Sequence, residues 1–344
     1  MVLLQPPDAN QQQLYDVSDP LHPRLLCRIS NTTAHLFTGD TFEYLKPVSP
    51  TETDVMLRSL GSGNESVAGK FPFYAPAAAW LPDQSVAAYT LQVPPDNADF
   101  PNGGVAVYLY AHQQASLLYR YPIPATDCIC RFGFPPQVLA VSPDGQYVVA
   151  GWPIGKGASP LMVYRVSDRT LAIALDSTVT RVFWDRGGHR LFLSRDAPAA
   201  AQSWTPESGV TNLGGAAAWS YLPGESPDGG EVAYTAYLDA AAMNQLRVYR
   251  YDFKAGTTRL LIDKLRSQVL FVKDGWLWYL EEVACDPAAC NAPWGTQPTG
   301  KVFAMQLTGG VETQVTFATE ENPIAPSDGV NPVLFGPGEF WPSS

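Results

Sequence analysis

The sequence predicts an all-β protein, a β-propeller of seven four-stranded blades. Two observations carry this prediction: the composition and a repeated hairpin pattern. Apolar residues make up 46% of the 344 residues, and 28 Gly and 31 Pro are spread among them. This composition supports a packed core interrupted by many turns, and excludes a disordered chain. A strand–turn–strand pattern recurs seven times along the chain, which is typical of a repeat architecture.

Each hairpin repeat consists of an apolar strand, a polar turn and a second apolar strand. The clearest copies are LAVSPDGQYVVAG at 139–151 and YLPGESPDGGEVAYT at 221–235. In these turns Pro presets φ, Asp accepts hydrogen bonds from nearby amides, and Gly supplies a positive φ. We therefore interpret the turn residues as structural first. The seven copies lie at 34–45, 77–89, 139–151, 181–193, 221–235, 269–280 and 333–342.

A further strand pair follows every hairpin except the last, and completes a four-stranded meander. LRVYRYDFKAGTTRLLI at 246–262 is the clearest outer pair, with alternating apolar residues around a turn at 254–256. The last hairpin lacks such a pair, while an unclaimed pair lies near the N-terminus. We therefore expect one blade closed by N- and C-terminal strands, within a single domain over 1–344; six blades is the alternative. The expected blades are 28–68, 76–122, 136–175, 179–214, 216–261, 265–315 and a composite of 13–27 with 333–342.

The hairpins at 139–151 and 221–235 resemble the SPDG-type repeats of TolB-like, WD40-like β-propellers. The hairpins at 77–89 and 269–280 match this pattern in part, and the others keep only the strand pattern. The resemblance implies the propeller fold over nearly the whole chain, and an exported protein. It carries no reaction, because the motif is structural.

The connections after the second strand of each unit are expected to be long, and to form a binding face. They are predicted at 46–54, 92–104, 152–160, 195–200, 238–245 and 282–299, with the 122–136 stretch alongside. Carboxylates and aromatic rings on such a face could hold a cation or a polar ligand. The candidate ligand-binding residues are Asp96, Asp99, Phe100, Trp152, Tyr237, Asp239, Glu281, Glu282, Asp286 and Trp294.

No catalytic residue is assigned, because the sequence lacks the common hydrolase, metalloprotease and nucleotide-binding motifs. His189, close to Asp185, is interpreted as a turn residue. Ca²⁺ is the one cofactor that we keep in view, since carboxylates and loop carbonyls are its preferred ligands; its ligands are not assigned. The alternative function is therefore a Ca²⁺-assisted propeller hydrolase, such as a lactonase or a glycosidase.

The net charge and the cysteines indicate which partners and which cellular compartment to expect. A net charge of −11 argues against a nucleic-acid partner, which requires a basic surface. Of the five cysteines, Cys285 and Cys290 are the disulfide candidates, and the partner of Cys27 is not assigned. The sequence contains no membrane-spanning apolar run. We expect an extracytoplasmic protein, periplasmic, cell-surface or secreted, whose signal or anchor lies outside this sequence.

These observations favour a binding or scaffold function over an enzyme. We expect a monomer that presents the long-connection face to a protein, a peptide or a glycan. A purely structural role in the cell envelope fits the same observations, and the sequence does not separate the two.

Overall fold

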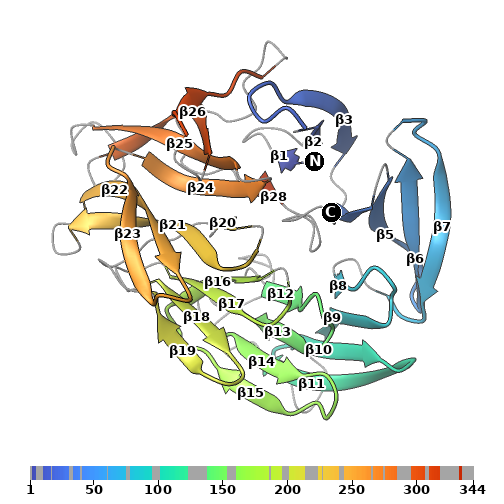
Figure 1. Ribbon diagram of the computed structural model, residues 1–344. Helices are drawn as coiled ribbons and strands as arrows, with labels where there is room; N and C mark the ends of the chain where they lie inside the picture. The colour runs from blue at the N-terminus through green and yellow to red at the C-terminus, as the bar shows by residue number, and fades with distance from the viewer. Residues whose placement is uncertain are drawn as a thin grey trace. The chain divides into compact units, whose positions relative to one another are not determined.

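The computed structural model describes the chain except for residues 1, 5–10, 17, 31–33, 39–40, 60, 75–77, 95–100, 123–137, 153–159, 186, 196–200, 214–223, 227, 240–243, 265, 274–275, 285–295, 307–309, 318–332 and 335–344. The described residues form four-stranded antiparallel sheets and contain no helix (Figure 1). Their organisation is consistent with a β-propeller. The chain divides into two compact units, residues 32–191 and residues 1–31 with 192–344, and each unit is described by itself below.

In the unit of residues 32–191, three complete sheets follow one another along the chain, and in each the strands pair in sequence order. The first sheet is β4 (Ala34–Thr38), β5 (Thr41–Ser49), β6 (Glu52–Ser59) and β7 (Glu65–Phe71). The second is β8 (Ala78–Trp80), β9 (Val86–Val93), β10 (Gly104–Ala111) and β11 (Gln114–Pro122). The third is β12 (Val138–Val141), β13 (Tyr147–Gly151), β14 (Met162–Arg165) and β15 (Leu171–Ala174).

The next sheet contains the boundary between the units, and two further meanders belong to the unit of 1–31 with 192–344. The sheet at the boundary is β16 (Val179–Trp184), β17 (Leu191–Arg195), β18 (Gln202–Thr205) and β19 (Gly209–Asn212). It is followed by β20 (Gly224–Glu225), β21 (Glu231–Asp239), β22 (Asn244–Asp252) and β23 (Thr257–Ile262). The last meander is β24 (Arg266–Lys273), β25 (Trp276–Ala284), β26 (Thr296–Gln306) and β27 (Thr313–Gln314).

One sheet joins the two ends of the chain, as the sequence predicted. Its order is β28 (Val333–Leu334), β1 (Val2–Leu4), β2 (Gln11–Asp16) and β3 (Arg24–Ser30). The division of strands differs from the prediction, because β1 takes the second place, paired with β28 through Leu3 and Leu334. Residues 335–342, expected to form that strand, lie outside the described residues.

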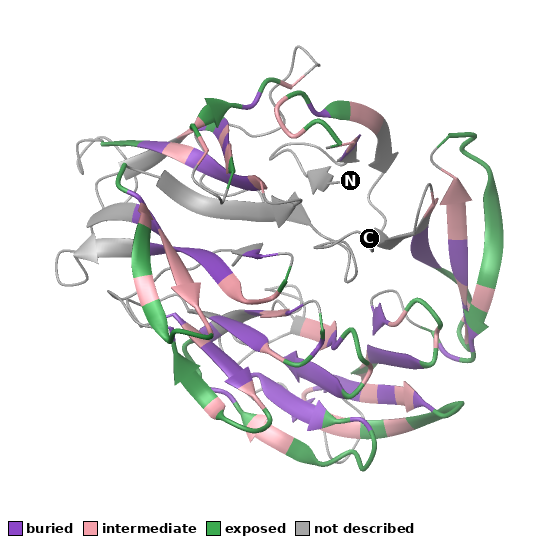
Figure 2. Ribbon diagram, viewed as in Figure 1, coloured by how far each residue is buried: buried purple, intermediate pink, exposed green. Residues whose placement is uncertain are grey.

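Neighbouring sheets of each unit are held together by apolar side chains. In the first unit, Val55 and Phe71 of one sheet pack with Trp80 and Ala87 of the next, and all four are buried. In the other unit, Tyr15 packs with Trp278 and Val302. Figure 2 shows the consequence within the first unit: the outer strand β7 is largely exposed, whereas β13 is buried along its length. Burial on both faces explains why the inner strands are continuously apolar.

Four of the turns between first and second strands, those after β8, β12, β16 and β20, share one pattern of backbone hydrogen bonds. In the turn after β12, Ser142 accepts from Gly145, and its own amide donates to Tyr147 O. Asp144 Oδ1 accepts from the Ser142 hydroxyl at 2.5 Å and from Gln146 N at 3.0 Å. The turn after β20 repeats these bonds through Ser226 and Asp228. The interpretation of these turn residues as structural is therefore confirmed.

The fourth position of these turns requires a positive φ. Gly145, Gly188 and Gly229 occupy it, with φ of 70°, 75° and 67°. Two of them also lie against a neighbouring sheet: a Cβ on Gly145 would come within 2.8 Å of Leu81 Cδ1, and one on Gly188 within 2.7 Å of Asp144 N. Glycine is therefore needed there both for φ and for space.

Several predicted connections are shorter in the structure. The one expected at 238–245 is reduced to 240–243, because β21 ends at Asp239 and pairs there with Asn244, which begins β22. Residues 46–54 were expected to form a long connection, but β5 continues to Ser49 and β6 begins at Glu52, so that only Pro50 and Thr51 connect them. The prediction failed because Pro47 and Ser49 were interpreted as loop residues, although β5 pairs with β6 through both of them.

We predict that Gly188→Ala destabilises the protein by roughly 1–3 kcal/mol, because alanine would adopt a strained φ and approach Asp144. The matched control is Gly187→Ala, since a Cβ on Gly187 meets nothing within 4 Å; we expect it to stay within about 0.5 kcal/mol of wild type. Urea unfolding measures both. Equal stability of the two variants would contradict the prediction.

A buried carboxyl links β5 and β8. Glu43 is only 5% exposed, and Trp80 Nε1 donates to its Oε2 at 3.2 Å. Burial raises the pKa of Glu43 above its ordinary value of 4.5, and the Trp80 hydrogen bond offsets this only in part. The folded protein therefore holds this proton more tightly than the unfolded chain does.

We predict that the stability Glu43 contributes is present below pH 4.5 and is lost as the pH rises through its raised pKa. Glu43→Gln keeps an acceptor for Trp80 but does not titrate. Relative to Glu43→Gln, the wild-type protein should therefore lose stability as the pH rises through this window, as measured by urea unfolding at several pH values. Parallel pH profiles for the two proteins would count against this account.

Candidate functional site

The candidate site is a groove of about 760 Å³ in the unit of residues 32–191. Its walls come mainly from four turns: those after β8, β10, β12 and β14. These are the connections that follow the first and third strands of two neighbouring sheets. We call this site the short-turn groove. It is lined by Lys70, Asp83, Gln84, Ser85, Val86, Tyr110, Ala111, His112, Gln113, Gly145, Gln146, Tyr147, Arg165, Val166 and Ser167.

Left-handed backbone is concentrated along this groove. Among the described residues, four that are not glycine have a positive φ, and three of them line the groove: Gln84 at 60°, His112 at 52° and Gln113 at 61°. Such conformations cost about 1–3 kcal/mol each and cluster at functional sites. The strain therefore marks this groove as a candidate site.

His112 and Gln113 form the whole connection between β10 and β11. The strands pair up to Ala111 and Gln114, so the loop has two residues, both left-handed. This is the geometry of a type I′ turn, which favours Asn-Gly because these residues tolerate positive φ. His-Gln is a costly choice here, and it places two exposed polar side chains on the groove wall.

Gln84 takes the place that glycine occupies in the related turns. Its amide donates to Leu81 O at 2.8 Å, as Gly145 N donates to Ser142 O. Its side chain lies against β7, where a Cβ on Gly69 would come within 1.9 Å of Gln84 Oε1. The absence of a side chain on Gly69 thus makes room for the Gln84 amide at the groove.

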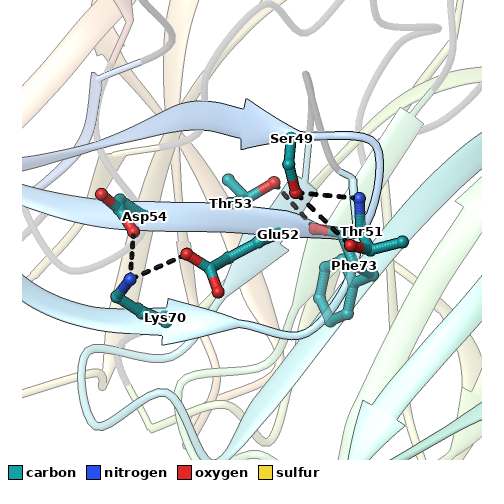
Figure 3. Close-up of polar contacts among 7 residues, drawn as sticks. All are labelled: Ser49, Thr51, Glu52, Thr53, Asp54, Lys70 and Phe73. Carbon is teal, nitrogen blue, oxygen red and sulfur yellow. Dashed lines mark hydrogen bonds and ion pairs between the residues drawn. The ribbon is translucent and has the colours of Figure 1, made fainter.

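Lys70 is held by two carboxylates of its own sheet (Figure 3). Its Nζ lies 2.7 Å from Glu52 Oε1 and 3.5 Å from Asp54 Oδ1. The hydrogen bond to Glu52 is the main cause that raises the pKa of Lys70, and the charge of Asp54 adds to it. Beside them, buried Thr53 donates to Phe73 O at 2.8 Å and ties β6 to the segment after β7.

The other charged groups of the groove are also paired. Arg165 Nη1 lies 2.9 Å from Asp168 Oδ2. The hydrogen bond from the Thr170 side chain is the largest of the causes that lower the pKa of Asp168 to about 2, and Arg165 contributes to them. Hydrogen bonds from Ser85, chiefly that of its side chain at 2.6 Å, lower the pKa of Asp83. Charge in the groove is thus balanced locally.

None of the predicted binding residues that the structure describes lines the short-turn groove. Trp152 is fully buried and stacks on Tyr121 at 4.8 Å, so it packs in the core rather than on an exposed face. Tyr237 and Asp239 belong to β21, and Glu281 and buried Glu282 to β25. Glu281 Oε2 accepts from Thr299 at 3.0 Å and lies 3.4 Å from Lys301 Nζ. Asp96, Asp99, Phe100, Asp286, Trp294, Cys285 and Cys290 lie outside the described residues.

Sequence reasoning missed the residues of the short-turn groove, although one signal was present. LPDQ at 81–84 departs from SPDG at its glycine, and this substitution marks an unusual backbone position. The interpretation of His189 as a turn residue is confirmed, since its amide donates to Asp185 Oδ1 at 2.7 Å. In the described part of the chain, no three His, Cys, Asp or Glu side chains are grouped to hold a metal ion.

Comparison with solved structures shows likeness of fold at low sequence identity. A putative 6-phosphogluconolactonase from Bacteroides uniformis ATCC 8492 is 11% identical with a TM-score of 0.51, over 91% of this chain and 94% of that one. TolB from Acinetobacter baumannii is 15% identical with a TM-score of 0.42, over 75% of this chain and 61% of that one. The match thus spans less than two thirds of that TolB chain.

The solved structures that this chain resembles include TolB and related β-propeller proteins, which confirms the resemblance predicted from the SPDG-type turns. No family model matches the sequence, and no curated protein matches it. Identities this low carry the fold alone, so the function has to be argued from the site. Within the described residues, no helix is long and apolar enough to span a bilayer.

We predict that replacing the strained turn with the residues its geometry favours stabilises the protein. His112→Asn with Gln113→Gly should raise the free energy of unfolding by about 1 kcal/mol, since both positions are left-handed. The control is Arg169→Gly, a position with φ of 61° that does not line the groove and should also gain stability. Urea unfolding measures both, and a loss of stability in the double variant would show that the turn is not strained.

Proposed function

We propose that the chain is an extracytoplasmic, monomeric β-propeller of seven blades, the composite sheet included, that works as a binding module. Its ligand, a protein, a peptide or a glycan, occupies the short-turn groove. The long connections that carry Asp96, Asp99, Phe100, Asp286 and Trp294 would form a second, accessory surface. The support for the blade number is the series of four-stranded sheets and the pairing of β28 with β1.

One observation carries the binding function: three residues that are not glycine keep a left-handed backbone around one groove. Selection for stability alone would place Gly or Asn at these positions, as it does at Gly145 and Gly188. A ligand that needs these side chains would explain why the costlier residues are kept. The volume of the groove lies within the range of about 300–1,000 Å³ that is common for ligand pockets.

The calcium-assisted hydrolase stays a prediction without a supporting observation. Its metal ligands are not assigned, and the acidic residues Asp96, Asp99 and Asp286 of the candidate binding face lie outside the described residues. A reaction would also need a nucleophile or a general base in a defined geometry. In the groove the Ser85 hydroxyl donates to Asp83 at 2.6 Å, but the lowered pKa of that carboxyl makes it a weak base, so binding is the function that the geometry supports best.

The binding function is tested by screening the wild-type protein against immobilised peptide and glycan arrays, and repeating the screen with two turn variants. We expect a ligand that wild type and Arg169→Gly retain, and that the His112→Asn, Gln113→Gly double variant binds at least tenfold more weakly. Circular dichroism and urea unfolding establish that the variants are folded. The proposal would be contradicted if the wild-type protein bound no ligand, or if all three proteins bound the ligand equally well.

A further inference from the structure

The charged side chains of the short-turn groove are already satisfied within the chain. Lys70 lies between Glu52 and Asp54, Arg165 is paired with Asp168, and Asp83 accepts from Ser85. An ionic ligand would have to compete with these internal partners. The pairing therefore favours a ligand without charge.

The uncommitted polar groups of the groove are amides and a hydroxyl. Gln84, Gln113 and Gln146 line it together with Ser167, and no side-chain hydrogen bond to another described residue occupies any of these four. Each amide carries two donors and an acceptor, and a hydroxyl is both donor and acceptor. Groups of this kind complement a ligand whose own polar atoms are hydroxyls.

Aromatic surface accompanies these amides. The ring of half-buried Tyr110 is fixed by edge contacts with Phe71 at 5.7 Å and Phe73 at 5.4 Å. Tyr147 of the neighbouring sheet also lines the groove, but it is buried and its ring stacks on Trp184. A fixed aromatic ring contributes apolar contact at little entropic cost and keeps a polar tip. The C–H face of a sugar ring is an apolar surface of matching size.

A peptide fits this groove less well. Extended peptides are commonly bound by main-chain pairing with an exposed strand edge. Turns line the short-turn groove instead, and their amides are used internally: Leu81 N donates to Val86 O, Gln84 N to Leu81 O, and Gln146 N to Asp144. Recognition would therefore depend on side chains, as the amide and hydroxyl set already suggests.

We propose that the ligand of the short-turn groove is an uncharged glycan, held by the glutamine amides and Ser167 against the ring of Tyr110. This inference rests on the proposed binding function and specifies its ligand class.

The test uses an array of neutral oligosaccharides of glucose, galactose, mannose and N-acetylglucosamine, their uronate- and sulfate-bearing counterparts, and a peptide array of equal density. We expect neutral glycans to be bound, with an affinity that changes less than about twofold between low and high salt, because no charge is neutralised.

Calorimetry with the best neutral oligosaccharide then compares two exposed glutamines. Gln146→Ala, in the groove, should weaken binding about fivefold, the loss expected for one hydrogen bond. Gln114→Ala, next to the turn but outside the groove, should leave binding unchanged.

The outcomes separate the two proposals. Binding of charged glycans or peptides that weakens in Gln146→Ala would overturn the glycan assignment and leave the binding function standing. Neutral glycans bound equally by wild type, Gln146→Ala and the turn double variant would overturn the groove as their site. Failure of every class to bind would overturn both proposals.

Discussion

The structure depends on one backbone constraint: in the turns after β8, β12, β16 and β20 the fourth residue is left-handed, and two of the glycines at this position lie close to a neighbouring sheet. Gly145 approaches Leu81, and Gly188 approaches the backbone of Asp144. The same backbone hydrogen bonds close the turns after β8, β12, β16 and β20, and Ser and Asp side chains add further bonds in the turns of Ser142 and Ser226. Apolar packing between sheets then supplies the stability, while the turns fix how closely adjacent sheets approach.

At the short-turn groove, residues other than glycine occupy left-handed positions. Gln84 adopts the left-handed conformation without being glycine, and its side chain uses the space that Gly69 leaves on β7. The two-residue turn of His112 and Gln113 is costly in the same way. At three positions around the short-turn groove, the residues present make the protein less stable than Gly or Asn would. Function explains this pattern more readily than folding does.

Much of the fold could be predicted from the sequence, because strand periodicity and turn chemistry are local. The SPDG turns, the hairpins and the pairing of the two chain ends follow from such patterns. The length of β5 could not be predicted, since proline and serine at a strand end resemble a loop until pairing with β6 is known. The burial of Trp152 depends on stacking with Tyr121, which is distant in sequence. The groove was missed because its residues are ordinary Gln, His and Ser; only their shared backbone conformation makes them unusual.

The most direct test of the central claim is a hydrogen–deuterium exchange footprint of the wild-type protein with a bound ligand. The account predicts that protection increases at residues 83–86, 110–113 and 145–147, the turns that line the short-turn groove. Any change of exchange in the connections after the second strands, such as 94–103 and 285–295, should be smaller than in these turns. Protection confined to those connections would contradict the account. It would indicate that the ligand binds at the long connections, as the sequence alone suggested.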